Sequence, residues 1–537
     1  MEPAARPETV KRGGWQKFSN WQLSAILLIA LALRLMYFGW AQSHGLGYQI
    51  DGIEAYEVAT HYEAGDERAH YLGQPNCNEH SKLPGPGWTL FCVAGLKLYG
   101  SLDGVALLII FANIAAIILT WRLARDVADR TAANFTALFM AVSLWAVQFS
   151  SIVWNPSSMP LFGAVIFLAL FRCLRETKSR TIFWIPFLLL VGAQFHLSTL
   201  SLVVPLIIFG WLARLRPNWG WLAAGLIAAL LCYVPYILGD MRHDWANTRG
   251  MLAGGAGKFS ADALKVFSSP FSFLINIWNP GWTYAPGEYE TLARRAFGGF
   301  TGMRVINVVS AGFVVCLVWG VIQATRLAMK NRSGALRETL AQPPGLLSAV
   351  FLLLAYLAFN FVAGKPFHAR YCLLVLPLLF TLAGCGAAQC LRSPWLKTVF
   401  LPLMLVTVAA DLWFMPVICR FEGDRIANGP VFVPSRAKME FVYQQLKTRA
   451  PGRVDVNDKD YLAAIPPGEK NNIYRHARLI RRYINSREVE LLAAGKTFSQ
   501  TNIFELRAAS AVSTNDPAVA FYGNGIALVA LPGSAQH

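Results

Sequence analysis

Charged residues are scarce in this chain. They make up 15% of its 537 residues, whereas ordinary soluble domains contain roughly 25%. Hydrophobic residues account for 55% of the chain and aromatic residues for 13%. This composition excludes a disordered protein and an average cytosolic enzyme.

Acidic residues are scarcer than basic ones, with 31 against 48, which leaves a formal net charge of +17. Such an excess of positive charge is compatible with binding to a nucleic acid, an anionic membrane surface or an anionic substrate.

Two further sequence features are missing. Residues 1–20 are polar and basic, so they do not resemble a removable signal peptide. No glycine-rich phosphate-binding loop occurs, so a soluble nucleotide-sugar donor is not indicated.

Long apolar stretches, in contrast, recur along the first 420 residues. A transmembrane helix needs about 17 to 25 mostly apolar residues. We therefore predict a polytopic α-helical membrane protein with about eleven spans, at 22–40, 103–121, 131–149, 158–173, 182–196, 197–213, 221–239, 304–325, 345–363, 370–390 and 398–418. The stretch 86–99 is too short to span and is predicted to be a juxtamembrane helix at the interface.

The basic residues orient these spans. Short cytoplasmic loops are rich in Lys and Arg, and with the N-terminus inside, nineteen of the 48 basic residues fall in the predicted inner segments. This pattern accounts for much of the net charge and leaves no need for a nucleic-acid partner. We predict a multi-pass membrane protein with a cytoplasmic N-terminus.

An odd number of spans places the C-terminal part on the outer side of the membrane. We predict a cytoplasmic N-terminus at 1–21, a transmembrane domain at 22–419 and a small extracytoplasmic α/β domain at 420–537. Within the transmembrane domain, residues 41–102 form the first outer loop and residues 240–303 a large outer loop. In the C-terminal domain, stretches 435–446 and 472–492 are helix-like, and 502–506 and 525–531 are strand-like.

Polar residues are rare in mid-span and gather on the predicted outer face. A transporter needs ionisable groups near the bilayer midplane, so the pattern favours an enzyme that acts at the outer membrane–water boundary. A lipid-linked oligosaccharide transporter or flippase remains an alternative, as does a glycan polymerase or ligase.

The first outer loop opens with a carboxylate pair. Asp51 and Glu54 share a helix face at i, i+3, and two close carboxylates raise the pKa of one of them. Such a pair can supply a general base near neutral pH. The alternative is an ordinary solvated helix start, where an acidic residue complements the helix dipole.

Asp51 is followed by Ala59 eight residues later and by Gly65 six residues further on. A Lys-Leu-Pro turn at 82–84 comes next, and a later span ends in Trp-Arg-Leu-Ala-Arg at 121–125. With this pattern, the N-terminal half resembles lipid-linked-sugar glycosyltransferases of the GT-C fold, which include protein O-mannosyltransferases and aminoarabinose and galacturonic acid transferases. The family often has Glu directly after the Asp, where this chain has Gly52.

Three further segments resemble the family or a subgroup of its bacterial members. They are His-Ala-Arg-Tyr at 368–371, Trp-Asn-Pro at 154–156 and Gln-Phe-His-Leu-Ser at 194–198. Better-known relatives often carry an acidic residue near Pro156, whereas this chain has Ser157 and Ser158.

The resemblance implies an inverting glycosyltransferase of the bacterial inner membrane, with its C-terminal domain in the periplasm. Such an enzyme moves a sugar from a polyprenyl-phosphate donor to lipid A or its core, a lipid-linked glycan or a protein. Asp51 is then the base, with Glu54 as its catalytic neighbour, and Lys82 and Arg370 bind the donor phosphate. The predicted substrate-binding residues are Asn155, His196, His368 and Tyr371. We predict no required metal or other cofactor, because a phosphate monoester leaving group carries less charge than a diphosphate.

Each assignment has a plainer alternative. Lys82 and Arg370 can be interfacial anchors whose charged ends reach the lipid headgroups, and Asn155 before a proline is a common turn residue. Arg34, in the first span, is either such an anchor or a phosphate contact.

Overall fold

The structure of the protein is a computed structural model. It describes residues 21–43, 50–75, 81–176, 178–255, 312–326, 346–362, 369–428, 436–449, 452–457, 473–493, 496, 501–508, 519–523 and 526–530.

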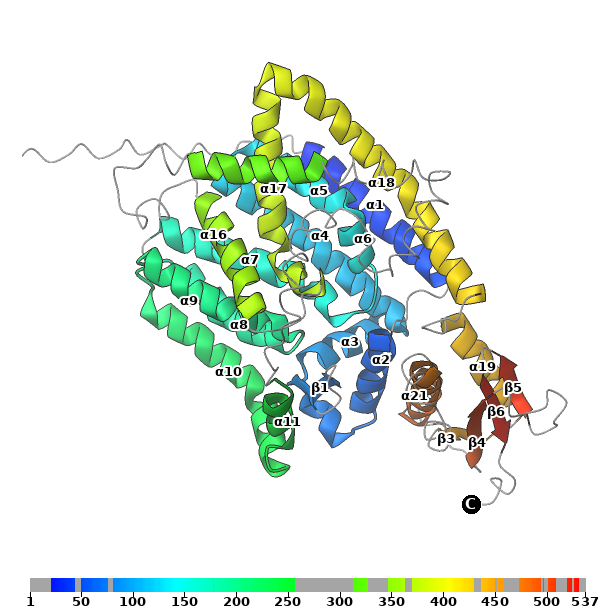
Figure 1. Cartoon of the computed structure of the whole chain (residues 1–537). Coiled ribbons are helices and arrows are strands. Elements are labelled where there is room, and N and C mark those ends of the chain that lie inside the picture. The colour runs from blue at the N-terminus through cyan, green and yellow to red at the C-terminus, as the bar shows by residue number, and fades with distance from the viewer. Residues whose placement is uncertain are drawn as a thin grey trace, which may run out of the picture.

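The apolar stretches of the sequence form a bundle of helices (Figure 1). Its labelled helices are α1 (Trp21–Ser43), α4 (Leu102–Val127), α5 (Arg130–Val142), α6 (Leu144–Phe149), α7 (Met159–Arg175), α8 (Trp184–Ala193), α9 (Val203–Leu212), α10 (Trp219–Arg242), α16 (Leu346–Val362), α17 (Leu376–Arg392) and α18 (Pro394–Asn428). A further helix covers Gly312–Arg326. Short 3-10 helices lead into four of them: η2 (Asn155–Ser158), η3 (Arg180–Phe183), η4 (Leu197–Leu202) and η7 (Ala369–Val375). Every predicted span overlaps a helical element.

Five stretches of the described chain are long and apolar enough to cross a membrane. They are Trp21–Gly39, Leu102–Val127, Asn155–Arg175, Trp219–Arg242 and Cys372–Arg392. Shorter apolar helices cover Arg180–Ala193, Leu197–Leu212, Gly312–Arg326, Leu346–Phe359 and Pro394–Val406. These helices indicate a membrane protein, while the count of eleven spans stays a prediction.

Helix α17 forms the centre of the bundle, since nearly all of its side chains are buried. Small residues let neighbouring helices approach it closely. Gly384 lies against Thr136 of α5, whose hydroxyl donates to Phe380 O at 3.2 Å. Gly386 lies so close to the helix at 312–326 that an added Cβ would be 1.9 Å from Cys316 O.

The predicted span 131–149 is broken at Ser143, where α5 ends and α6 begins. Arg34 of α1 reaches this break with a fully buried side chain. Its guanidinium donates to Met140 O at 3.0 Å, to Ala141 O at 3.1 Å and to Ala30 O of its own helix at 3.1 Å. Arg34 is therefore neither a headgroup anchor nor a phosphate contact, because it holds the last carbonyl groups of α5.

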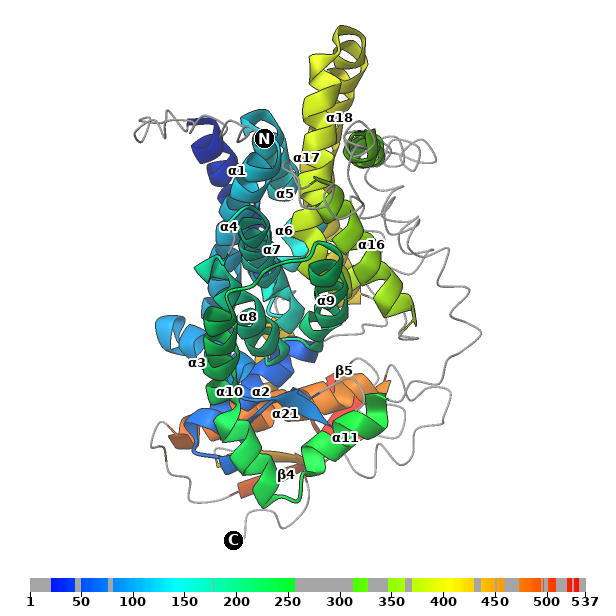
Figure 2. The same cartoon turned by 90° about the vertical axis from the view of Figure 1, so that its left-hand side faces the viewer.

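Short elements gather at one end of the bundle in both views (Figures 1 and 2). They are α2 (Ile50–Glu63), η1 (Glu67–His70), the antiparallel strands β1 (Leu72–Pro75) and β2 (Lys82–Pro84), α3 (Gly87–Tyr99) and α11 (Ala246–Gly255). Helix α3 confirms the helix predicted at 86–99. Its position at a membrane interface stays a prediction.

The C-terminal part, residues 436–530, lies at the same end (Figure 2). It consists of α19 (Arg436–Arg449), β3 (Arg453–Asn457), α21 (Ile473–Ala493), β4 (Thr501–Ala508), β5 (Val519–Gly523) and β6 (Ile526–Ala530). The strands form a sheet in the order β3-β4-β6-β5, in which β3 and β4 are parallel and the other pairs antiparallel. The four predicted secondary-structure stretches match these elements, whereas α18 continues past residue 420, the predicted boundary. The domain limits and the periplasmic location stay predictions.

Candidate functional site

Helix α2 carries both predicted catalytic carboxylates. Asp51 is the second residue of the helix, and Glu54 follows one turn later. The Glu54 carboxylate is held on two sides. It accepts a hydrogen bond from Gln74 Nε2 at 3.3 Å and forms an ion pair with Arg482 of α21. Gln74 is itself fixed, since its Oε1 accepts from Trp88 Nε1 at 2.9 Å. The structure thus gives Glu54 an arginine partner that the sequence did not indicate, and its catalytic role stays a prediction.

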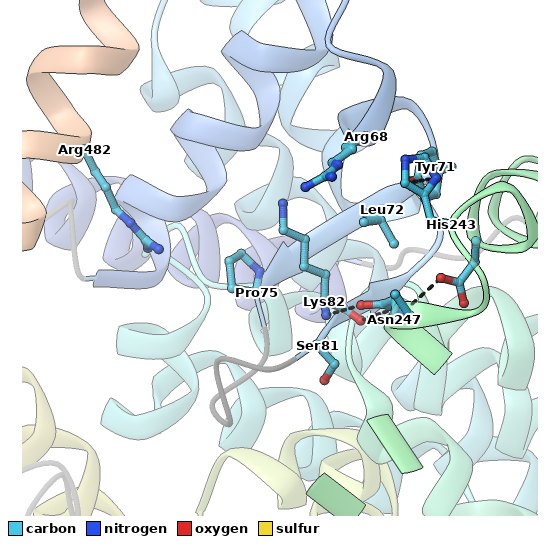
Figure 3. A pocket seen from close by; sticks show the side chains of 11 residues that line it. Arg68, Tyr71, Leu72, Pro75, Ser81, Lys82, His243, Asn247 and Arg482 are labelled. Atoms are coloured by element: carbon cyan, nitrogen blue, oxygen red, sulfur yellow. Dashed lines mark hydrogen bonds between the residues drawn. The ribbon is translucent and has the colours of Figure 1, made fainter. Parts of the chain in front are cut away.

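Lys82 is the first residue of β2, and its backbone forms two hydrogen bonds with Asn247 of α11. Its N–H donates to Asn247 Oδ1 at 2.6 Å, and Asn247 Nδ2 donates back to Lys82 O at 3.1 Å. The Lys82 side chain extends toward the guanidinium of Arg68, from η1 (Figure 3). Neither side chain has a carboxylate within ion-pair distance among the described residues. Two like charges therefore converge at this point.

These two cations line a cavity of about 360 Å³ between the first loop, α10–α11 and α21. Arg482 adds a third cation from the C-terminal part, and Figure 3 places it across the cavity from Arg68 and Lys82. The polar wall comes from Tyr71, Ser81, His243 and Asn247. We call this space the cationic cavity.

Asp240 is the carboxylate in the wall of the cationic cavity, and its oxygens are occupied by α11. Oδ1 accepts from Asn247 N at 2.9 Å, and Oδ2 accepts from Thr248 N at 3.0 Å and Thr248 Oγ1 at 2.6 Å. The Tyr236 hydroxyl also donates to Oδ2, at 3.3 Å. The negative charge of Asp240 thus complements the N-terminus of α11. The other charged side chains in the cavity wall, Arg68, Lys82 and Arg482, are positive.

His243 and Tyr71 close the same wall. The Tyr71 hydroxyl lies 3.1 Å from His243 Nδ1, which is also 3.0 Å from Gly239 O. The Tyr71 ring packs directly on Gly239, where a Cβ would lie 2.2 Å from the ring. Burial raises the pKa of Tyr71 above its ordinary value.

A second cavity of about 160 Å³ lies beside the first, with Lys82 and Arg482 in both walls. Its wall also contains Asp66, whose Oδ2 lies 3.1 Å from His61 Nδ1 and whose Oδ1 accepts from Arg68 N at 2.9 Å. Partial burial raises the pKa of Asp66. The hydrogen bonds from Arg68 N and His61, with the charges of His61 and Lys82, outweigh that effect and lower the pKa below its usual value. This cavity thus mixes both signs of charge.

The predicted substrate residues Asn155 and His196 have protein partners. Asn155 Nδ2 donates to Phe195 O at 2.9 Å, which joins η2 to the turn before η4. His196 caps η4, because its Nδ1 accepts from Ser198 N at 3.3 Å and lies 2.7 Å from Ser198 Oγ. Gln194 bridges this turn to Gly87 N at 3.0 Å and to Cys232 O at 3.2 Å. These side chains hold the loops together, and their contacts with substrate stay predictions.

The remaining predicted residues belong to the loop before α17. Arg370 and Tyr371 lie in η7, which packs against η2, η4 and α7. The structure therefore brings η7 near η2, which contains Asn155, and near η4, which His196 caps. His368 lies outside the described residues, and the roles of all three stay predictions.

Within the described ranges, no group of three or more His, Cys, Asp or Glu side chains can hold a metal ion. The expectation of a metal-independent reaction stays a prediction.

Two cations of the site are absent from the sequence prediction. Arg68 lies in the first loop without a motif around it, and Arg482 lies in a helix-like stretch rich in basic residues. Only their positions in the fold distinguish them from ordinary surface charges.

Comparison with known proteins supports the fold. No family model and no curated protein sequence match the chain. The chain is similar to ArnT from Cupriavidus metallidurans in a crystal structure bound to undecaprenyl phosphate. The TM-score is 0.57 and the sequence identity is 14%, and the match covers 97% of this chain and 100% of that one. Its apo structure gives a TM-score of 0.57 and 12% identity, over 95% and 98%. The oligosaccharyltransferase AglB from Archaeoglobus fulgidus is more distant, with a TM-score of 0.46 and 10% identity over 91% of this chain and 69% of that one.

Proposed function

The chain has the GT-C fold, and from this premise we propose that it is an inverting glycosyltransferase. It moves a sugar from a polyprenyl-phosphate donor to a hydroxyl group of a glycan, lipid or protein acceptor. The reaction takes place at the outer face of the bacterial inner membrane, with the C-terminal part in the periplasm.

The cationic cavity is the observation that carries this proposal. Arg68 and Lys82 converge from different elements, with no ion-paired carboxylate among the described residues (Figure 3). Convergence of like charges costs free energy, which a bound anion offsets. Arg offers a planar fork to a phosphate and Lys a point charge, so the pair suits the phosphate of a lipid carrier. The full-length similarity to a protein that was crystallised with undecaprenyl phosphate supports the same ligand chemistry.

The proposed reaction assigns a role to each charged group. Asp51 takes the proton from the acceptor hydroxyl, whose oxygen attacks the anomeric carbon of the sugar. The bond between this carbon and the phosphate oxygen breaks on the opposite side, which inverts the configuration. The lipid phosphate leaves with its charge held by Lys82, Arg68 and, from η7, Arg370. Glu54 supports the base through its ion pair with Arg482.

The interior of the bundle disfavours the transporter alternative. Arg34 is hydrogen-bonded to carbonyl groups, and Asn113 donates to Ile109 O at 3.0 Å and Ser157 O at 2.9 Å. Both side chains connect segments of the bundle through these hydrogen bonds, which favours a structural role for them over a place in a path through the bilayer.

The test uses the full chain in lipid nanodiscs with a panel of synthetic polyprenyl-phosphate sugars. Loss of one charge-assisted hydrogen bond costs about 1.5–3 kcal/mol, so Arg68→Gln and Lys82→Gln each raise the KM for the active donor about 10-fold or more. Arg453→Gln, an exposed arginine of β3, is the matched control and behaves as the wild type.

Transfer from no donor of the panel, or donor use unaffected by both cation variants, contradicts the proposal. Added chelator leaves the rate unchanged if the reaction needs no metal, and a complete loss that one divalent ion restores contradicts that expectation.

A further inference from the structure

Helices α2 and α21 lie side by side, although they are more than 400 residues apart in the chain. Arg482 of α21 bridges two carboxylates that are one turn apart on α2. Its guanidinium contacts Glu54 directly, and its Nε lies 3.4 Å from Glu57 Oε2. The exposed fractions of the Arg482 and Glu54 side chains are only 14% and 13%. This ion pair is therefore largely shielded from solvent.

Apolar packing reinforces the contact. The rings of Tyr56 and Tyr483 have centroids 6.2 Å apart. Ile53 of α2 and Ile484 of α21 are fully buried and belong to the same hydrophobic core. The C-terminal part thus shares a core with the helix that carries Asp51.

Helix α21 is in turn fixed to its own sheet and to α19. Glu488, with 1% of its side chain exposed, accepts from the Tyr443 hydroxyl at 2.8 Å and pairs with Lys447 Nζ at 2.6 Å. Arg487 pairs with Glu440 of α19, with Nε 3.5 Å from Oε2. Arg482 therefore contacts α2 from a helix, α21, that is itself fixed by its packing on α19.

The predicted base, Asp51, precedes Glu54 by one helical turn. We propose that Arg482 is a positioning residue for sugar transfer: it fixes α2 through Glu54 and Glu57, and through α2 it fixes Asp51. The C-terminal part is then required for the catalytic step. This inference rests on the proposed function.

The physical basis is the loss of the arginine that two neighbouring carboxylates share. Without the guanidinium, Glu54 and Glu57 repel each other across one helical turn in a partly buried setting. Movement of α2 away from α21 lets water reach both carboxylates and screen this repulsion, and Asp51 moves with the helix. A displacement of about 1 Å at a reacting group can lower a rate about 100-fold. Donor binding is retained, because Arg68 and Lys82 hold the donor phosphate from other elements, whereas the charge of Arg482 is neutralised by Glu54 and Glu57.

The test compares Arg482→Gln and Arg482→Lys with the control Arg453→Gln, each as the full chain in nanodiscs. Arg482→Gln lowers kcat for the polyprenyl-phosphate donor about 10- to 100-fold, while its KM changes by less than about threefold. Arg482→Lys restores part of kcat, because an ammonium group still neutralises one carboxylate. Hydrogen exchange of the amides in 50–63 speeds up in Arg482→Gln and stays unchanged in Arg453→Gln.

A rise in KM with kcat unchanged overturns the inference, because Arg482 then binds the donor directly. Unchanged exchange in α2 overturns it as well. If Arg482→Gln does not fold, Glu57→Gln serves as a second variant. It removes one of the two contacts and lowers kcat by a smaller factor, and a kcat equal to that of the wild type overturns the inference.

The two proposals fail in different ways. If the wild type transfers no sugar, the proposed function fails and the exchange measurement alone decides whether Arg482 fixes α2. If the wild type is active and Arg482→Gln has the same kcat, only the positioning role fails.

Discussion

Gly163 provides a test of the contact that places the Arg370 segment. It lies on α7, against the backbone of η7. A Cβ at this position would lie 1.9 Å from Leu374 O, whereas ordinary contact begins at 3.4 Å. The methyl group of Gly163→Ala therefore forces α7 and η7 apart by about 1.5 Å, the difference between these distances.

The displacement has two expected consequences. Overpacking of a close contact costs about 1–3 kcal/mol of stability. In addition, η7 carries Arg370 and Tyr371, and a shift of about 1 Å in a substrate-positioning segment can cost about 100-fold in rate. We expect Gly163→Ala to lower both the apparent Tm and kcat/KM for the donor.

The assay measures thermal unfolding and donor turnover of the purified variant. Gly210→Ala of α9 is the matched control, because a Cβ there meets only Leu215 Cδ1 at 3.7 Å. If Gly163→Ala has the stability and turnover of the control, the close packing of α7 on η7 is refuted, and with it the account of how η7 is placed.

Two further predictions concern other parts of the molecule. Arg34→Met removes the donor to Met140 O and Ala141 O. We expect a loss of about 2–3 kcal/mol in the free energy of unfolding, which is measured as a lower apparent Tm. A variant as stable as the wild type contradicts the proposed role of Arg34. The lowered pKa of Asp66 in the folded state means that its ionised form adds stability at neutral pH, which is lost as the pH falls through the folded-state pKa. Asp66→Asn therefore lowers the apparent Tm at pH 7, and the difference from the wild type shrinks below the usual carboxyl pKa of about 3.9; a difference that does not change with pH refutes this reasoning.

The helices of the bundle could be predicted from the sequence, because long apolar stretches recur with basic loops between them. The interruption at Ser143 is not marked in the hydrophobic pattern: Ser143 caps α6, and the buried guanidinium of Arg34 binds the carbonyl groups at the end of α5. Local hydrophobicity does not report such a distant partner. The helices and strands of the C-terminal part could also be predicted, because their apolar residues follow the periodicity of each type of element.

The candidate site was predictable only where a motif marks it. Lys82 in its Lys-Leu-Pro turn does line the cationic cavity. Arg68 and Arg482 have no local signature, and the partner of Arg482, Glu54, is 428 residues away in the chain. The amide group of Asn155 connects two loops, and its predicted contact with substrate stays a prediction. Long-range pairing between charges is set by the fold, so it cannot be derived from spacing along the chain.

Sugar transfer by Asp51→Asn tests the central claim most directly. The measurement is the initial rate of transfer from the active polyprenyl-phosphate donor, with wild type and variant matched for apparent Tm. General base catalysis contributes about 10²- to 10⁴-fold, so we predict a loss of at least about 100-fold in kcat with the KM for the donor retained. A variant that transfers sugar at the wild-type rate contradicts the account.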